Sequence, residues 1–314
     1  MLQHLSASFD AAGFLSVASL LFSLQTLSLL IKPPLDDSET FNLQASAEAN
    51  HLPQLTEFKI YVDDADGFIG LSDVFSSLSV PVLRHFEFDS GDLNGTWFRA
   101  FISMLRRSEG CQLEKIVLVN EQSAQEDLAP LFDLPALSSL THLHINAKDR
   151  QTQACPLSEM ELEALNPRLT RNSGRLSACL LNLKVLSCSG HFGVEDLVNL
   201  ISLVKSRALY VTERQEEQQS IPKAGELLDI QPLQTVKIIH LAQSRALQII
   251  QANTLDALED QTGTKVILQS EDKAEICSSR VSSYYFHNYD ASLLEDALLG
   301  RRWPECEKQG SPQY

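Results

Sequence analysis

The chain has 314 residues, of which 44% are hydrophobic and 7% aromatic, so it can bury a sizeable core. Its formal net charge is −16, and this excess of negative charge repels phosphate backbones, which argues against nucleic-acid binding. Six scattered cysteines with no Cys-x-x-Cys match neither a disulfide framework nor a zinc site. They predict reduced, mostly buried thiols in a cytoplasmic or nuclear protein.

The first apolar segment, residues 14–31, carries no charge and approaches the length of a membrane-spanning helix. Several serines, a glutamine and a threonine within it make it too polar for a span. Residues 1–13 contain no Lys or Arg, so they lack the basic start of a signal peptide. We therefore expect a helix that leads into a buried strand, and no membrane partner.

A short pattern then recurs along the chain: an apolar residue, two others, an apolar residue, one other and a final apolar residue. The first five copies begin at intervals of 31, 28, 30 and 27 residues, and gaps of 43 and 50 precede the sixth and seventh. Leucine-rich repeats place a strand and a helix in about 20–29 residues, so this spacing predicts long, degenerate units of that class. The copies begin at Leu24, Leu55, Leu83, Leu113, Leu140, Leu183 and Leu233.

In each copy, the last two apolar residues lie two positions apart and share one face of a short strand. The residue between them points to the opposite face, and it is polar in five of the first six copies. This pattern is typical of a strand with one solvent-exposed side. The candidate binding residues at this position are Lys59, Glu87, Val117, His144 and Ser187.

Helical periodicity replaces the strand pattern between copies, for example in residues 70–78, 96–105 and 194–204. Capping boxes at residues 123–126 and 158–161 mark further helix starts. The alternation predicts an α/β fold: a leucine-rich-repeat solenoid of the ribonuclease-inhibitor kind, with parallel strands on the concave face and helices on the convex face. We expect two domains, a solenoid over residues 1–270 and a capping segment with a tail over residues 271–314.

Some segments depart from the repeat. Residues 146–182 and 212–232 are expected to be loops or insertions, and the second is charged, glutamine-rich and without an apolar period, which predicts a mobile loop. Residues 241–258 then predict a helix, and residues 265–269 a terminal strand. An aromatic run at 284–289 could anchor a partner, but a cap is favoured because an uncapped solenoid exposes its core.

Motifs for chemistry are missing from the sequence, which contains no Gly-x-Ser-x-Gly, His-Glu-x-x-His, Walker A or Gly-x-Gly-x-x-Gly. Residues 63–67 begin like a calcium loop, but Val74 occupies the place of its closing glutamate. His142 and His144 alternate on one strand, yet no Cys or carboxylate beside them completes a metal site. We expect no enzymatic activity, no cofactor and no metal, and an active site on residues 146–182 or 212–232 is the weaker alternative.

Six strand blocks carry a family resemblance, and they read LQTLSL, LTEFKI, LRHFEF, LEKIVL, LTHLHI and LKVLSC. Over roughly residues 14–270, these blocks and the segment LVNLISLVKSRAL with its following LQTVKII resemble the C-terminal part of fungal F-box proteins with degenerate leucine-rich repeats. In that family an N-terminal F-box docks on a Skp-type adaptor of a cullin ubiquitin ligase, and the repeats select a substrate.

The resemblance implies a protein-interaction module that recognises the substrate of such a ligase on its concave face. The chain departs from the family at its start, because residues 1–13 do not read as an F-box and the repeats begin at once. A Skp-type adaptor is therefore expected as a partner only if an F-box lies upstream, and we expect a preceding segment to cover the first repeat. The alternative is a stand-alone repeat scaffold with no role in ubiquitin transfer.

Overall fold

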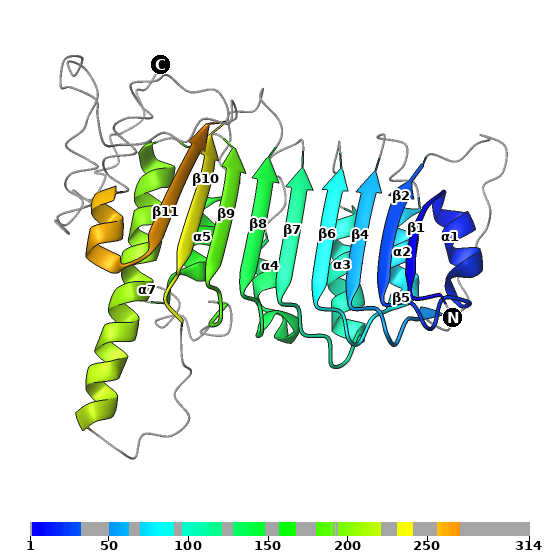
Figure 1. Ribbon diagram of the computed structural model, residues 1–314, viewed down its shortest axis with the longest axis horizontal. Coiled ribbons are helices and arrows are strands. Elements are labelled where there is room, and N and C mark those ends of the chain that lie inside the picture. The colour runs from blue at the N-terminus through cyan, green and yellow to red at the C-terminus, as the bar shows by residue number, and fades with distance from the viewer. Residues whose placement is uncertain are drawn as a thin grey trace, which may run out of the picture.

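The computed structural model describes residues 2–32, 50–62, 70–90, 96–120, 128–147, 157–167, 180–190, 192, 194–220, 231–240 and 256–270. Across these residues, nine strands form one sheet, and each strand lies beside the next one along the chain (Figure 1). All neighbouring pairs in this sheet are parallel, which confirms the predicted α/β class and strand direction. The strands are β1 His4–Phe9, β2 Thr26–Ile31, β4 Glu57–Val62, β6 His85–Ser90, β7 Lys115–Asn120, β8 His142–Ala147, β9 Val185–Gly190, β10 Thr235–His240 and β11 Lys265–Ser270.

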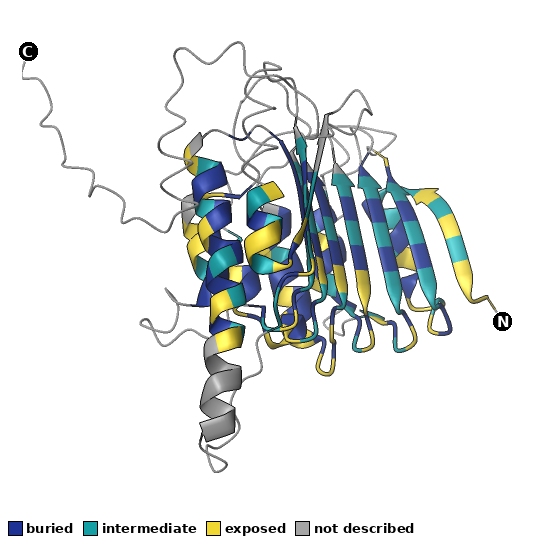
Figure 2. Ribbon diagram, turned by 60° about the vertical axis from the view of Figure 1, so that its left-hand side comes forward, coloured by how far each residue is buried: buried dark blue, intermediate teal, exposed yellow. Residues whose placement is uncertain are grey.

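The helices cover one face of this sheet, and in Figure 1 α2 to α5 lie behind the strands, with α1 beside one end of the sheet. Figure 2 shows buried residues concentrated between the helices and the sheet, where the core lies. The short strands β3 Asn50–His51 and β5 Leu78–Ser79 pair separately from the main sheet. The helices are α1 Ala11–Ala18, α2 Leu71–Ser77, α3 Thr96–Arg107, α4 Ala129–Phe132, the 3-10 turn Pro135–Leu137, α5 Glu159–Leu165, α7 Val194–Ser220 and the short helix at residues 256–262.

Neighbouring strands pair residue for residue, so equivalent positions form straight rows across the sheet. Lys59, for instance, lies opposite Glu87, which lies opposite Val117. Successive side chains alternate between the two faces of a strand. In the main-sheet strands from β2 to β10, the second and fourth residues are buried against the helices. The first, third and fifth residues of the strands share the other side of the sheet, which we call the polar face.

A repeated backbone contact fixes this register at the start of the strands. The carbonyl oxygen of Gln25 accepts hydrogen bonds from the backbone N–H groups of Thr56 and Glu57, at 2.9 and 3.1 Å. The same two-donor contact recurs at every step from β1 to β10. Each unit is thereby placed at the same stagger against the previous one, because a slip of one residue would turn every side chain to the wrong face. The accepting carbonyls belong to Gln3, Gln25, Thr56, Arg84, Glu114, Thr141 and Lys184.

The leucine that opens each copy of the repeat packs beneath this contact. All seven of these leucines are at most 2% exposed. In several units another buried apolar residue lies three positions earlier and accepts a backbone hydrogen bond from the leucine, as Val80 does from Leu83 and Leu180 from Leu183. Full burial of a leucine side chain stabilises the fold by about 1.5–3 kcal/mol, so the turns before the strands also contribute to the core.

Aromatic side chains form a dense cluster between β6 and helices α2 and α3. The rings of Phe86 and Phe101 stack at 4.3 Å between centroids, and those of Phe88 and Trp97 stack at 4.1 Å. Phe75 of α2 meets all four of these rings at 5.6–6.3 Å. Such contacts add about 0.5–1.5 kcal/mol per pair beyond burial. The cluster holds β6 firmly in place, and β6 carries Glu87 on the polar face.

The N-terminal apolar segment divides between two elements. Helix α1 ends at Ala18 and β2 begins at Thr26, which confirms the interpretation of residues 14–31 as a helix that leads into a buried strand. In the described parts of the chain, no helix is long and apolar enough to cross a membrane. Strand β1 was not predicted from the sequence, although Leu2, Leu5 and Ala7 repeat the spacing of the later copies.

The two segments expected to be loops are partly helical. Helix α7 continues to Ser220, so the prediction of a loop is wrong for residues 212–220. The physical reason is composition, because Glu, Gln and Arg are good helix formers even without an apolar stripe. Within residues 146–182, α5 begins at the predicted capping box, in which Ser158 Oγ accepts from the Glu161 backbone N–H at 3.4 Å.

Of the remaining predictions, some fall on described residues and others lie outside them. The terminal strand is confirmed as β11, and of the helix expected at 241–258 the structure describes residues 256–258, which are helical. The capping box at 123–126 and the turn at 63–67 lie outside the described residues. The same holds for residues 271–314, including the aromatic run.

A fully buried arginine holds the turn before β9. Arg207 of α7 is 0% exposed, and its Nη2 donates to the carbonyl oxygens of Leu180 and Leu183 at 3.2 and 3.3 Å and of Gln231 at 3.0 Å. Leu180 has a φ of 43°, a left-handed conformation that is unfavourable for a leucine. The buried cation therefore satisfies carbonyl groups of a strained turn and positions β9 beside β8.

Replacing this cation by an apolar side chain of similar length tests its role. Arg207→Met removes charged donors and leaves buried carbonyl groups without them, so we expect unfolding free energy to fall by about 3 kcal/mol in chemical denaturation. The control Arg106→Met alters an exposed arginine of α3 and should change stability by no more than about 0.5 kcal/mol. Equal effects of the two substitutions would contradict a structural role for Arg207.

Candidate functional site

The five candidate binding residues lie in one row of the polar face. Lys59, Glu87, Val117, His144 and Ser187 occupy β4, β6, β7, β8 and β9, and each lies opposite the next. Because adjacent strands are about 4.8 Å apart, the row spans about 19 Å. The structure therefore brings together residues that are up to 128 positions apart in the sequence.

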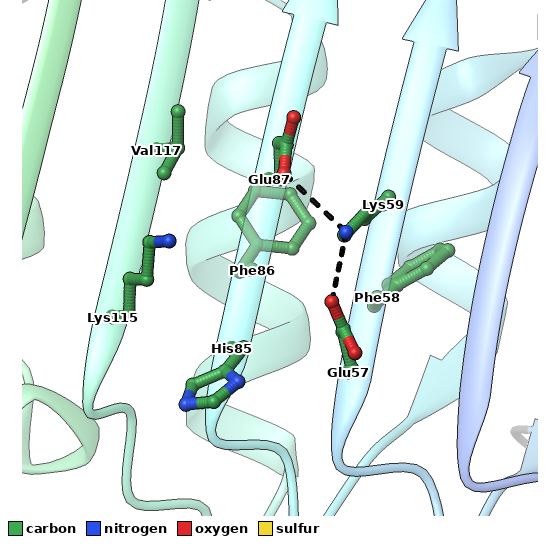
Figure 3. A pocket seen from close by; sticks show the side chains of 8 residues that line it. All are labelled: Glu57, Phe58, Lys59, His85, Phe86, Glu87, Lys115 and Val117. Atoms are coloured by element: carbon green, nitrogen blue, oxygen red, sulfur yellow. Dashed lines mark ion pairs between the residues drawn. The ribbon is translucent and has the colours of Figure 1, made fainter.

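Ion pairs connect the first two residues of this row (Figure 3). Lys59 Nζ lies 2.9 Å from Glu57 Oε1 and 3.9 Å from Glu87 Oε2. The hydroxyl of Tyr61 donates to Glu87 Oε1 at 3.2 Å. The hydrogen bond to Glu57 raises the pKa of Lys59, and burial, with help from Glu87, raises the pKa of Tyr61. Lys59 is thus a cation held between the carboxylates of Glu57 and Glu87, so this part of the face keeps a net negative charge.

A second set of charges lies at the starts of the strands. Arg84, directly before β6, forms an ion pair and hydrogen bond with Glu114, directly before β7. His85 Nε2 lies 3.9 Å from the other carboxylate oxygen of Glu114. These groups are substantially exposed, so they contribute little to stability. They do fix the positions of charged side chains at one border of the polar face.

His144 and His142 have lowered pKa values. Burial is the main cause for both, followed by Lys237 and Lys115 for His144 and by Lys115 for His142. Both side chains are therefore biased toward the neutral form. Within the described part of the chain, no group of three or more His, Cys, Asp or Glu side chains could hold a metal ion.

Ser187 differs from the other four candidates because it is only 6% exposed. Its hydroxyl oxygen makes no hydrogen bond within the described structure. Ser189 on the same face is likewise buried, at 3% exposure. The alternation rule places Ser187 on the polar face, but burial limits what a partner could reach there.

A shallow depression interrupts the polar face between β4 and β7 (Figure 3). Its volume is about 50 Å³, far below the roughly 300–1,000 Å³ of pockets that enclose small molecules. A broad face with a shallow depression suits contact with a large partner better than enclosure of a small ligand. The residues that line it are Glu57, Phe58, Lys59, His85, Phe86, Glu87, Lys115 and Val117.

Two of the six cysteines lie in the described part of the chain, and both are buried and free, as predicted. Burial raises the pKa of the Cys111 thiol to about 12. Its Sγ donates to the Leu83 carbonyl oxygen at 3.5 Å. At neutral pH Cys111 is a protonated thiol, which makes it a poor nucleophile and a poor metal ligand.

Comparison with known proteins does not identify a family for this chain. No protein-family model, no curated protein and no solved structure matches the chain. The resemblance of the strand blocks to those of F-box proteins is therefore a hypothesis about function.

The histidine of the row, His144, predicts a pH effect on stability. The pKa of His144 is lower in the fold than its ordinary value of 6.5, so the unfolded chain binds more protons as the pH falls. The neutral imidazole therefore contributes its full stability above about pH 6.5, and this contribution is lost as the pH falls from 6.5 through the lower pKa of the folded state. We expect His144→Gln to lessen the fall in unfolding free energy between about pH 7 and about pH 5.

The measurement is chemical denaturation at several pH values. Asn146→Gln, on the same strand and face, is the matched control because it changes a side chain that does not titrate. It should keep the pH dependence of the unsubstituted protein. A pH dependence that is the same in His144→Gln and in the unsubstituted protein would contradict the assignment.

Proposed function

We propose that the chain is a leucine-rich-repeat solenoid that binds another protein on its polar face. The observation that carries this proposal is the row of candidate residues, whose side chains come from five successive strands and lie in register. An extended face of this kind is the usual binding surface of repeat proteins.

Three structural features support the solenoid part of the proposal. The strands follow chain order in one parallel sheet, each repeat opens with a buried leucine, and the same carbonyl contact recurs between units. Stacked repeats have these properties because each unit buries its apolar face against its neighbours. The irregular unit lengths agree with degenerate repeats rather than a uniform array.

The chemistry of the polar face supports binding rather than catalysis. Its charged groups on β4 and β6 pair with one another, its depression is shallow, and Cys111 is a buried, protonated thiol. A surface about 19 Å wide across five strands provides room for a polypeptide segment. We infer that the partner is a protein.

The resemblance to fungal F-box proteins suggests a more specific version, in which the polar face selects a substrate for a cullin-type ubiquitin ligase. The alternative is a stand-alone scaffold that binds a protein without ubiquitin transfer. Purification of the full gene product from its source cells separates the two versions. A Skp-type adaptor in the purified complex favours the ligase version, and a stable partner without ligase subunits favours the scaffold.

A bulky neutral substitution tests whether the polar face binds the partner. Val117→Trp places a large side chain at the centre of the row, where it blocks close approach whatever the charge of the partner. We expect at least about a tenfold loss in capture of the proteins that the unsubstituted chain retains, because central interface positions dominate binding. Quantitative mass spectrometry of the captured proteins provides the measurement.

Leu209→Trp is the matched control, since Leu209 is an exposed apolar residue of α7, outside the sheet. It should leave capture unchanged, and circular dichroism should show both variants folded. Retention of all partners by Val117→Trp, or an equal loss in both variants, would refute binding through the polar face.

A further inference from the structure

The polar face does not share the acidic character of the chain as a whole. The chain carries a net charge of −16 and 41 acidic residues. Four of them occupy the polar face and the positions directly before its strands, where six lysines and arginines also lie. The acidic residues are Glu57, Glu87, Asp89 and Glu114, and the basic residues are Lys59, Arg84, Lys115, Lys184, Lys237 and Lys265.

The two signs of charge are separated along the sheet. All four acidic residues lie between β4 and the residue before β7, and Glu57, Glu87 and Glu114 form ion pairs there with Lys59, Arg84 and His85. From β8 to β11, the described polar-face positions and the residues before these strands include no Asp or Glu. We call the region formed by Lys115, Lys184, Lys237 and Lys265, with His142 and His144 between them, the basic half.

Register brings the groups of the basic half close to one another. Lys115 lies directly opposite His142, and Lys265 lies opposite Thr235, two residues before Lys237. Burial is the main cause of the lowered pKa of His144, and Lys237 and Lys115 lower it further, against a smaller opposing effect of Glu87. Lys115 on β7 and Lys237 on β10 lie on opposite sides of β8, so both lysines are within electrostatic reach of the same imidazole.

The lysines of the basic half have no partner of opposite charge among the described residues. None of Lys115, Lys184, Lys237 and Lys265 lies within an ion pair there, in contrast to Lys59 and Arg84. Like charges gathered on one surface repel each other and weaken the fold. An anionic partner would remove this repulsion, so the charge pattern favours one.

We propose that the basic half binds an extended acidic peptide segment of the partner protein, which names the partner chemistry for the proposed function and rests on it. The five strands from β7 to β11 span about 19 Å, which an extended segment of about six residues would cross. Half-buried Val117, Val185 and Ile239 lie among the charged groups and suit apolar side chains between the acidic ones.

A peptide fits these observations better than a nucleic acid. The basic half is bordered by Glu87 and Glu114, which would repel a longer phosphate backbone that continued across the sheet. Nucleic-acid-binding faces also use exposed aromatic side chains on which bases stack. On the described polar-face positions from β7 to β11 there is no aromatic side chain other than the two histidines.

The test uses fluorescence anisotropy with three labelled probes of similar length: a peptide of alternating Glu and Ser, a peptide of alternating Lys and Ser, and an oligodeoxythymidine. We expect the full chain to bind the Glu–Ser peptide best, and the binding to weaken as salt rises from about 0.05 M to about 0.3 M. The double variant Lys115→Glu/Lys237→Glu should lose at least about tenfold in affinity.

Arg99→Glu/Arg106→Glu is the matched control, because it reverses two exposed cations on α3, outside the sheet. It should keep the affinity within about twofold. Lys115→Gln/Lys237→Gln, which removes charge without reversing it, should show an intermediate loss and serves if the reversal variant fails to fold. Tighter binding of the oligodeoxythymidine, equal binding of both peptides, or an equal loss in the control would overturn the proposal.

This outcome is independent of the capture experiment with Val117→Trp. If Val117→Trp abolishes capture while the Glu–Ser peptide fails to bind, the polar face is a binding surface for a partner of different chemistry, and the acidic-peptide proposal alone is wrong. If the peptide binds but Val117→Trp retains every captured protein, the proposed function is wrong for those partners.

Discussion

The recurring carbonyl contact at the strand starts is the constraint on which the rest of the structure depends. One backbone oxygen per unit accepts two N–H groups from the next unit, as Gln25 does from Thr56 and Glu57. This contact holds the stagger between units constant although the unit lengths vary. Since every side chain on a strand changes face with a slip of one residue, the polar face exists only while this stagger is kept.

Packing below the contact explains how the stagger survives irregular sequence. The leucine that opens each unit is buried, and Phe86 and Phe88 are fixed by stacking against Phe101 and Trp97. Where the units lengthen before β9, the buried Arg207 replaces part of this apolar packing with hydrogen bonds to a strained turn. The core therefore supports the same arrangement of strands by different means along the sheet.

The sequence was sufficient to predict β2, β4 and β6 to β10, and the face on which each of their side chains lies, because two-residue alternation after a leucine is a strong local signal. It failed at β1, where Leu2, Leu5 and Ala7 form a weaker copy, and at residues 212–220, where helix-forming polar residues carry no apolar period. The alternation of side chains along each strand was enough to predict that the residues from Lys59 to Ser187 share one face. It could not predict that Ser187 is almost completely buried.

The charge pattern of the polar face needed the structure, since it depends on which strands are neighbours. Lys115 and Lys237 are 122 residues apart in sequence, and only the order of the sheet shows that both act on His144. The net charge of −16 describes the whole chain and does not show this separation of acidic and basic residues along the sheet. The separation supports our proposal of an acidic partner at one half of the face.

The central claim is that the polar face is the surface that contacts the partner protein. Lysine acetylation of the free chain and of the partner-bound complex, compared by mass spectrometry, tests it most directly. The account predicts that partner binding protects Lys59, Lys115 and Lys237 on the polar face and leaves Lys205 on α7 as reactive as before. Protection of Lys205 with no change at the three polar-face lysines would contradict it.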